Sequence, residues 1–164
     1  MRKPVKLNAI IGTFVLLSST LCFAGSKENI EYVSLFGERV MVLGLGLKTV
    51  RLLDLEYPLL RCPKGDRYIC VKSEVLTFAI PRAGVWPSAW DYDNAQYIVL
   101  KEDNLAFNGE SLNYKVIRQT WRGQVVDYIY SAKRGVIAIK AKDGEQLTLS
   151  TACGFAAAST NRCQ

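Results

Sequence analysis

From Ile30 onward, the chain alternates short apolar runs rich in β-branched residues with turn residues. Turn signals containing glycine, asparagine or aspartate recur about every 8–15 residues, a spacing typical of β-sandwiches and barrels. We find no amphipathic helical pattern of useful length, apart from a short helix-prone piece at residues 155–159. The sequence therefore predicts an all-β fold, either a small antiparallel sandwich or a barrel-like meander.

Each apolar run between two turn signals is expected to form a strand. The expected strands cover residues 32–36, 39–47, 49–55, 58–62, 68–80, 97–101, 105–107, 112–120, 125–130, 136–141 and 146–151. Two glycines within 39–47 indicate kinks in a buried strand, and a bend is expected near Ser73. Asn108-Gly109 is typical of a two-residue hairpin turn. Residues 124–151 are typical of an antiparallel meander with one face in water.

Residues 1–24 have the three regions of a secretory signal peptide. Basic residues come first, an apolar stretch follows, and Cys22 and Ala24 place small residues at the −3 and −1 positions of a cleavage site. The apolar stretch is shorter than the roughly 20 residues that a membrane span needs, and the rest of the chain has no run of that length. We therefore expect a single all-β domain over residues 25–164, periplasmic or secreted. A membrane anchor and lipidation of Cys22 are the alternatives.

Charge and composition exclude several classes of function. The chain has 21 basic and 15 acidic residues, and without the three basic residues of the signal the balance is 18 to 15, a net charge of +3. Lysine and arginine are scattered and form no stripe, so we expect no nucleic-acid partner. There is no histidine, which excludes Ser-His-Asp and Cys-His catalysis and zinc sites that need imidazole.

Four cysteines remain after the signal: Cys62, Cys70, Cys153 and Cys163. An even number in an exported chain predicts two disulfides. We favour Cys62–Cys70 and Cys153–Cys163 because each closes a short loop, and residues 63–66 between the first pair are typical of a turn. The other two connectivities stay open. Without a C-x-x-C motif or histidine, we expect neither a redox nor a metal site.

Two short motifs resemble cofactor or metal loops but lack essential residues. Residues 44–49 contain two glycines and a lysine, but Leu47 stands where a phosphate-binding loop needs glycine, and Thr49 stands where a dinucleotide fingerprint needs one. Residues 91–94 begin like a calcium loop, and Ala95 breaks the pattern. We therefore expect no cofactor, and a looser calcium site is a weaker alternative.

Carboxylates are the one route to an enzyme that the composition leaves. Glycoside hydrolysis needs two carboxyl groups about 5–10 Å apart across a cleft. The candidates are Asp91, Asp93, Glu102 and Asp103. Their spacing does not pair them, so we assign no catalytic residue.

The most informative segment is residues 81–95, which lie between two expected strands and show no strand alternation. Loops of about fifteen residues in a small domain are usually functional or disordered. This one is rich in aromatic residues, which disordered segments lack and which binding hot spots contain. With Trp121 at an expected hairpin tip, the candidate partner-binding residues are Arg82, Trp86, Trp90, Tyr92 and Trp121. In the alternative interpretation the rings cover the core, where we also expect Tyr128 and Tyr130.

The sequence leads to one main hypothesis of function. We expect an exported, non-enzymatic binding protein of inhibitor or immunity type, which contacts another exported or envelope protein through residues 81–95. This step is an inference from fold and location. The alternatives are a glycan or cell-wall binding module that stacks sugars on Trp86, Trp90 or Trp121, a carboxylate-based hydrolase, and a structural subunit of an envelope assembly.

Overall fold

The computed structural model describes residues 29–35, 37, 40–63, 65–82 and 86–157, all of them in strands, turns or connecting segments. The predicted signal peptide, Cys22 and Cys163 lie outside the described residues. The strands are β1 (Asn29–Ser34), β2 (Val40–Gly44), β3 (Thr49–Leu52), β4 (Leu55–Pro58), β5 (Leu60–Arg61), β6 (Tyr68–Lys72), β7 (Thr77–Pro81), β8 (Ala89–Tyr92), β9 (Ala95–Phe107), β10 (Glu110–Trp121), β11 (Gln124–Ser131), β12 (Gly135–Ala141) and β13 (Gln146–Leu149). The all-β prediction is confirmed.

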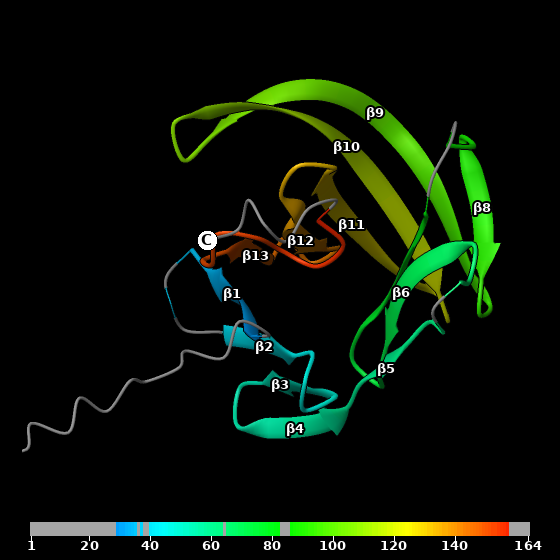
Figure 1. Ribbon diagram of the computed structural model, residues 1–164, viewed down its shortest axis with the longest axis vertical. Coiled ribbons are helices and arrows are strands. Elements are labelled where there is room, and N and C mark those ends of the chain that lie inside the picture. Colours follow the sequence, from blue (N-terminus) through cyan, green and yellow to red (C-terminus); the bar gives the residue numbers. More distant parts are fainter. Residues whose placement is uncertain (1–28, 36, 38–39, 64, 83–85, 158–164) are drawn as a thin grey trace, which may run out of the picture.

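The strands form two antiparallel sheets. Ten strands make one sheet in the order β4-β3-β2-β1-β13-β12-β11-β10-β9-β8, and β5-β6-β7 make the other. The large sheet consists of two meanders that are joined where β1 pairs with β13. It curves strongly, and the small sheet lies between its two edge strands, β4 and β8 (Figure 1). The predicted meander over residues 124–151 is confirmed as β11-β12-β13.

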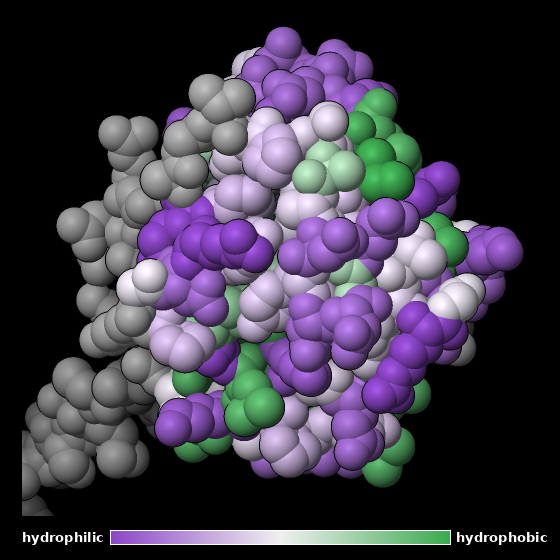
Figure 2. Space-filling model, turned by 90° about the vertical axis from the view of Figure 1, so that its right-hand side faces the viewer, coloured by the Kyte–Doolittle hydropathy of each residue, from purple (hydrophilic) through white to green (hydrophobic). Residues whose placement is uncertain are grey.

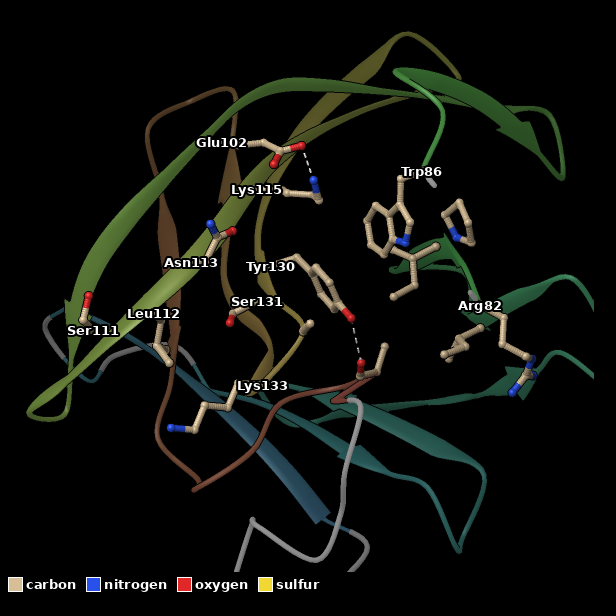
Figure 3. A pocket seen from close by; sticks show the side chains of 15 residues that line it. Arg82, Trp86, Glu102, Ser111, Leu112, Asn113, Lys115, Tyr130, Ser131 and Lys133 are labelled. Atoms are coloured by element: carbon tan, nitrogen blue, oxygen red, sulfur yellow. Dashed lines mark hydrogen bonds and ion pairs between the residues drawn. The ribbon is translucent and has the colours of Figure 1, made fainter. Parts of the chain in front are cut away.

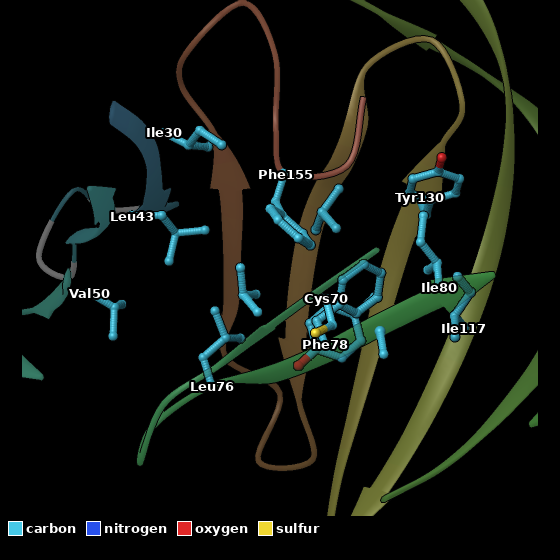
Figure 4. Packing of buried hydrophobic residues seen from close by; sticks show 14 of the residues in the cluster. Ile30, Leu43, Val50, Cys70, Leu76, Phe78, Ile80, Ile117, Tyr130 and Phe155 are labelled. Carbon is cyan, nitrogen blue, oxygen red and sulfur yellow. The ribbon is translucent and has the colours of Figure 1, made fainter. Parts of the chain in front are cut away.

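One apolar core fills the space between the two sheets. Phe78 of β7 is its centre, with ring centroids 4.4 Å from Tyr128, 6.1 Å from Phe155 and 6.5 Å from Tyr97. Figure 4 shows side chains of both sheets directed into this interior. Tyr128 and Tyr130 are buried, so their predicted place in the core is confirmed.

The outer edge of β7 is hydrogen-bonded to side chains of the large sheet and not to another strand. The Ala79 carbonyl accepts a 3.0 Å hydrogen bond from Trp90 Nε1, and the Thr77 carbonyl accepts bonds of 2.8 Å from Gln119 Nε2 and 2.9 Å from the Tyr128 hydroxyl. Buried backbone carbonyls are costly without donors. These three side chains of the large sheet therefore allow an edge strand to be buried.

Several predicted strands have different boundaries in the structure, and the expected strands 97–101 and 105–107 are parts of one strand, β9. The strand expected over 39–47 ends at Gly44, and a turn follows in which Lys48 has φ +56° and Leu47 is 78% exposed. The run over 68–80 is two strands, because the Ser73 hydroxyl accepts hydrogen bonds from the Val75 and Leu76 amides and closes a turn. Such side-chain bonds compete with continuation of a strand.

The predicted long loop is a loop only in part. Ala89–Tyr92 forms β8 and pairs with β9, so the prediction that residues 81–95 lack strand structure is wrong for their second half. Asp93 and Asn94 have φ values of +52° and +63°, which is the geometry of a two-residue hairpin turn. Asparagine and aspartate tolerate this conformation because of their short polar side chains.

The Cys62–Cys70 disulfide is present, with the two Cα atoms 5.2 Å apart, and it joins the end of β5 to β6. The Cys153–Cys163 pairing stays a prediction, because Cys163 is not among the described residues. In the helix-prone piece at 155–159, the described residues 155–157 contain no helix, and Phe155 and Ala156 lie in a turn. No helix in the described residues is long and apolar enough to span a bilayer.

Candidate functional site

A cavity of about 620 Å³ opens on the concave side of the β9–β10 hairpin. One end is aromatic and contains Trp86 and Tyr130, whereas the hairpin side is polar and contains Ser111, Asn113 and Lys115. Figure 3 shows these side chains around one space, with the rings and the hairpin residues on different sides of it. The site is therefore built from the loop after β7, the β9–β10 hairpin and the end of β11.

Strand alternation explains the polar wall. Ser111, Asn113 and Lys115 are separated by two residues along β10 and so share a face. On β9 the pairing skips Leu100, since Val116 is opposite Lys101 and Ile117 is opposite Val99. This β-bulge shifts the alternation and brings Glu102, the partner of Lys115 in the register, to the cavity side.

The aromatic end is held by ring and hydrogen-bond contacts. The rings of Trp86 and Tyr130 are stacked, with centroids 5.2 Å apart and planes at 26°. Trp90 meets the edge of Trp86 at 5.9 Å, and the Tyr130 hydroxyl donates a 3.2 Å bond to the Ala156 carbonyl. Burial raises the pKa of Tyr130 to about 12, so this hydroxyl stays protonated at neutral pH. The rings therefore form one packed aromatic wall of the cavity.

Three cations border the cavity. Lys115 forms an ion pair with Glu102, and its Nζ lies 5.6 Å from the centre of the Trp86 ring. Lys133 contacts Glu110 at 2.8 Å. The Arg82 guanidinium donates to the backbone carbonyls of Asp66 and Tyr68, at 2.9 and 3.3 Å.

Glu110 forms ion pairs with two cations, Lys133 and Arg134. Its Oε1 accepts from Lys133, while its Oε2 accepts two bonds from Arg134 at 2.8 and 3.1 Å. The hydrogen bonds from Lys133 and Arg134 lower the pKa of this carboxyl. One negative charge is therefore shared between two positive charges at this rim of the cavity.

The structure divides the five predicted contact residues into separate groups. Arg82 and Trp86 line the cavity. Trp90 is 6% exposed, stacks on Tyr97 at 5.4 Å and belongs to the core. This position fits the alternative interpretation, in which the ring covers the core.

Tyr92 and Trp121 lie elsewhere. The Tyr92 hydroxyl is 2.9 Å from Cys70 Sγ and 3.2 Å from Cys62 Sγ, and it is the donor because disulfide sulfurs carry no hydrogen. Trp121 lines a separate groove of about 590 Å³ with Leu60 and Arg122, whose guanidinium lies 4.7 Å from the centre of its ring. The turn predicted at Trp121 is confirmed, since Arg122 and Gly123 both have positive φ.

The sequence reasoning missed the polar half of the cavity. Ser111, Asn113 and Lys115 stand at alternate positions of an expected strand, a pattern that indicates a polar face. This signal did not show that the face is concave or that Trp86 lies opposite. Both depend on how the hairpin bends over the small sheet.

One of the four candidate acids, Glu102, lines the cavity. Asp93 pairs with Lys72 and Asp103 with Lys101, and Asp91 is exposed on β8. Among the described lining residues, Glu102 is the one carboxylate of the cavity. Within the same described part of the chain, no group of three metal-ligating side chains is found.

Hydrophobic contact surface is limited on the face that bears β8. In Figure 2 this face is mainly hydrophilic, and its hydrophobic residues form separate spots. No broad apolar patch is visible on this face. Comparison with known proteins gives no guide to the ligand of the cavity: no protein-family model, no curated protein and no solved structure matches the chain.

Proposed function

We propose that the protein is an exported, non-enzymatic binding protein of inhibitor or immunity type, and that the cavity between Trp86 and the β9–β10 hairpin receives a segment of another exported or envelope protein. The observation that carries this proposal is the cavity itself, in which stacked rings face hydrogen-bonding and charged side chains. Concave sites with apolar walls and a few convergent polar groups are the usual form of a binding site.

Rigidity supports a binding role. Trp86 is held by Tyr130 and Trp90, and Trp90 is in turn hydrogen-bonded to the Ala79 carbonyl. A preorganised site loses little conformational entropy on association. This low entropic cost favours the tight binding that an inhibitor needs. The disulfide and the predicted signal peptide are consistent with work outside the cytoplasm.

The carboxylate-based hydrolase receives no support from the site. Its chemistry requires a second carboxyl group about 5–10 Å from the first. Glu102 is the one carboxylate among the described lining residues, and it is already paired with Lys115. We therefore keep the non-enzymatic role as the proposal.

A capture experiment with cavity variants tests the function. The exported protein, with its disulfide bonds intact, is immobilised and exposed to the native exported fraction of its source. Asn113→Arg places a long side chain from an exposed position into the cavity. Thr120→Arg is the matched control, because Thr120 is also exposed on β10 but lies on its other face.

We expect one exported protein to be retained by the wild type and by Thr120→Arg, and lost with Asn113→Arg. Trp86→Ala should have the same effect as Asn113→Arg, and Trp121→Ala in the separate groove should have none. Retention that is equal for all variants, or no retained protein at all, would contradict the proposal. Circular dichroism spectra of the variants control for loss of fold.

A glycan or cell-wall binding module is the second candidate. The polar side chains of Ser111, Asn113 and Ser131 favour it, since hydroxyl and amide groups bind sugar hydroxyls. Titration with soluble wall fragments, followed by tryptophan fluorescence, separates the two. A shift that is lost with Asn113→Arg, without any captured protein, would favour the glycan.

A further inference from the structure

The charge around the cavity is unbalanced. Among the described lining residues there are three cations, Arg82, Lys115 and Lys133, and one carboxylate, Glu102. Glu110 lies beside Lys133 but is shared with Arg134. The cavity therefore has an excess of positive charge, which attracts a ligand with negative charge.

The cations also have hydrogen-bonding capacity to spare. An ammonium group has three donors, and the contacts of Lys133 Nζ use one of them, to Glu110. Arg82 contacts two backbone carbonyls and no carboxylate, so its charge is not neutralised by a described partner. Both side chains can donate further hydrogen bonds to a carboxylate of a ligand without losing the contacts that hold them.

The positions of the cations favour an extended ligand. Figure 3 shows Arg82 and Lys133 on opposite sides of the cavity, with their charged ends directed outward at its two rims, and Lys115 on the hairpin wall beside Trp86. A small anion meets one of these groups. A chain that crosses the cavity with several carboxylates meets all of them.

The state of Trp86 favours a peptide over a sugar chain. Sugar rings bind by stacking on a bare indole face, whereas the Trp86 ring is already in contact with Tyr130, Trp90 and Lys115. The remaining surface of the Trp86 ring can contact apolar side chains of a ligand, and it lies next to the Lys115 ammonium group. Alternating acidic and apolar side chains of a peptide match such a surface.

We infer that the cavity binds an acidic peptide segment in extended form, with its carboxylates at Arg82, Lys115 and Lys133. The inference rests on the proposed binding function and specifies the chemistry of the partner. The acidic segment belongs to the partner protein and crosses the cavity between the Trp86 ring and the β9–β10 hairpin.

The test uses N-acetylated hexaglutamate as the probe and the exported protein with its disulfide bonds intact. Binding is followed by amide chemical shifts of Asn113, Lys115 and Ser131 in NMR spectra. Hexalysine, trigalacturonate and inorganic phosphate are the comparison probes for the wrong charge, an acidic glycan and a simple anion. The expected result is a saturable shift with hexaglutamate alone, weakened by salt.

A pair of lysines in the same hairpin provides the matched variants. Lys115→Glu and Lys101→Glu change the net charge equally, and both lysines have an ion pair and an aromatic neighbour. The register places Lys115 opposite Glu102, on the cavity side, and Lys101 opposite Val116, on the other face. We expect Lys115→Glu to weaken hexaglutamate binding by more than about tenfold and Lys101→Glu by less than about twofold. Lys133→Glu, at a more exposed position, should also weaken binding.

Several outcomes would overturn the inference. They are no shift with hexaglutamate, equal loss with Lys101→Glu, binding of trigalacturonate alone, or full competition by phosphate. Other outcomes distinguish failure of the acidic-peptide inference from failure of the proposed function. Capture of a partner that is lost with Asn113→Arg but unchanged with Lys115→Glu would leave the binding function standing and refute the acidic peptide. Hexaglutamate binding without any captured protein would refute the inhibitor-type role alone.

Discussion

At the scale of single residues, Gln119 has the largest set of buried hydrogen bonds around β7. Its amide donates to the Thr77 carbonyl at 2.8 Å and to the Tyr97 hydroxyl at 3.1 Å. Its carbonyl oxygen lies 3.2 Å from the Tyr128 hydroxyl, whose one hydrogen it shares with the Thr77 carbonyl. The side chain is 3% exposed. A polar residue inside the sheet therefore completes the hydrogen bonding of a strand to which it is not paired.

Gln119→Leu tests this role. The change keeps the approximate size of the side chain and leaves buried polar partners without their bonds, so we expect a loss of about 2–4 kcal/mol in the free energy of unfolding. Urea denaturation measures it. Gln96→Leu, at an exposed position of β9, is the control and should stay within about 0.5 kcal/mol of the wild type. Equal effects of the two changes would refute the assigned role.

At the scale of elements, tight hairpin turns determine the course of the second meander. The turns at Asp93-Asn94, Asn108-Gly109 and Arg122-Gly123 all have two central residues with positive φ, the geometry that matches the twist of paired strands. Asn108-Gly109 was predictable because asparagine-glycine is the strongest signal for such a turn, and this prediction is confirmed. Asp93-Asn94 has a weaker signal, and the strand before it was therefore missed.

Gly109 and Gly135 have almost the same φ but different surroundings, so substituting each distinguishes the effect of backbone strain from the effect of crowding. Gly109 has φ +78° and open space around its Cα, whereas at Gly135, with φ +75°, an added methyl group would overlap the carbonyl oxygens of Gly154 and Phe155. These carbonyls belong to the segment that bonds the start of β12, where Val136 N donates to Phe155 O at 2.8 Å.

We expect Gly109→Ala to lower the free energy of unfolding by about 1 kcal/mol, through the unfavourable φ alone. Gly135→Ala should cost at least about 2 kcal/mol more, because the C-terminal segment must move away from β12. Thermal or urea unfolding of the two variants gives the difference. Equal losses would mean that the segment is not packed against Gly135 as described.

At the scale of the whole molecule, four buried tyrosines of the large sheet couple stability to pH. They are Tyr32, Tyr97, Tyr128 and Tyr130, and desolvation raises the pKa of each above its ordinary value of 10.0. Their neutral forms fit the folded state, whereas in the unfolded chain they ionise near pH 10. The unfolded state therefore binds fewer protons above that pH, and stability falls as pH rises.

Unfolding free energy should be unaffected by these groups below pH 10 and should decline between about pH 10 and 12. Each tyrosine contributes up to about 1.4 kcal/mol per pH unit in that window. Urea midpoints across the alkaline range measure the slope. Tyr130→Phe should reduce it by the share of one tyrosine, and a stability that is flat to pH 12 would contradict the burial of these hydroxyls.

Local patterns predicted a large part of the fold and a small part of the site. Alternation and turn residues identified the all-β class and the β11-β13 meander, and a short loop identified the Cys62–Cys70 bond. Of the residues that line the cavity, they singled out Arg82 and Trp86. They also grouped Trp90 with these two, because residue type alone does not distinguish an indole that faces a cavity from one that is bonded to a core carbonyl.

The sequence by itself determined what depends on neighbours along the chain: strand formation, hairpin turns, the local disulfide and the polar face of β10. Only the tertiary structure decided what depends on contacts between distant segments. These include the pairing of β1 with β13, the capping of β7 by Trp90, Gln119 and Tyr128, and the meeting of Trp86 with Lys115. The physical reason is that alternation assigns a residue to one face of a strand, whereas the curvature of the sheet decides what that face meets.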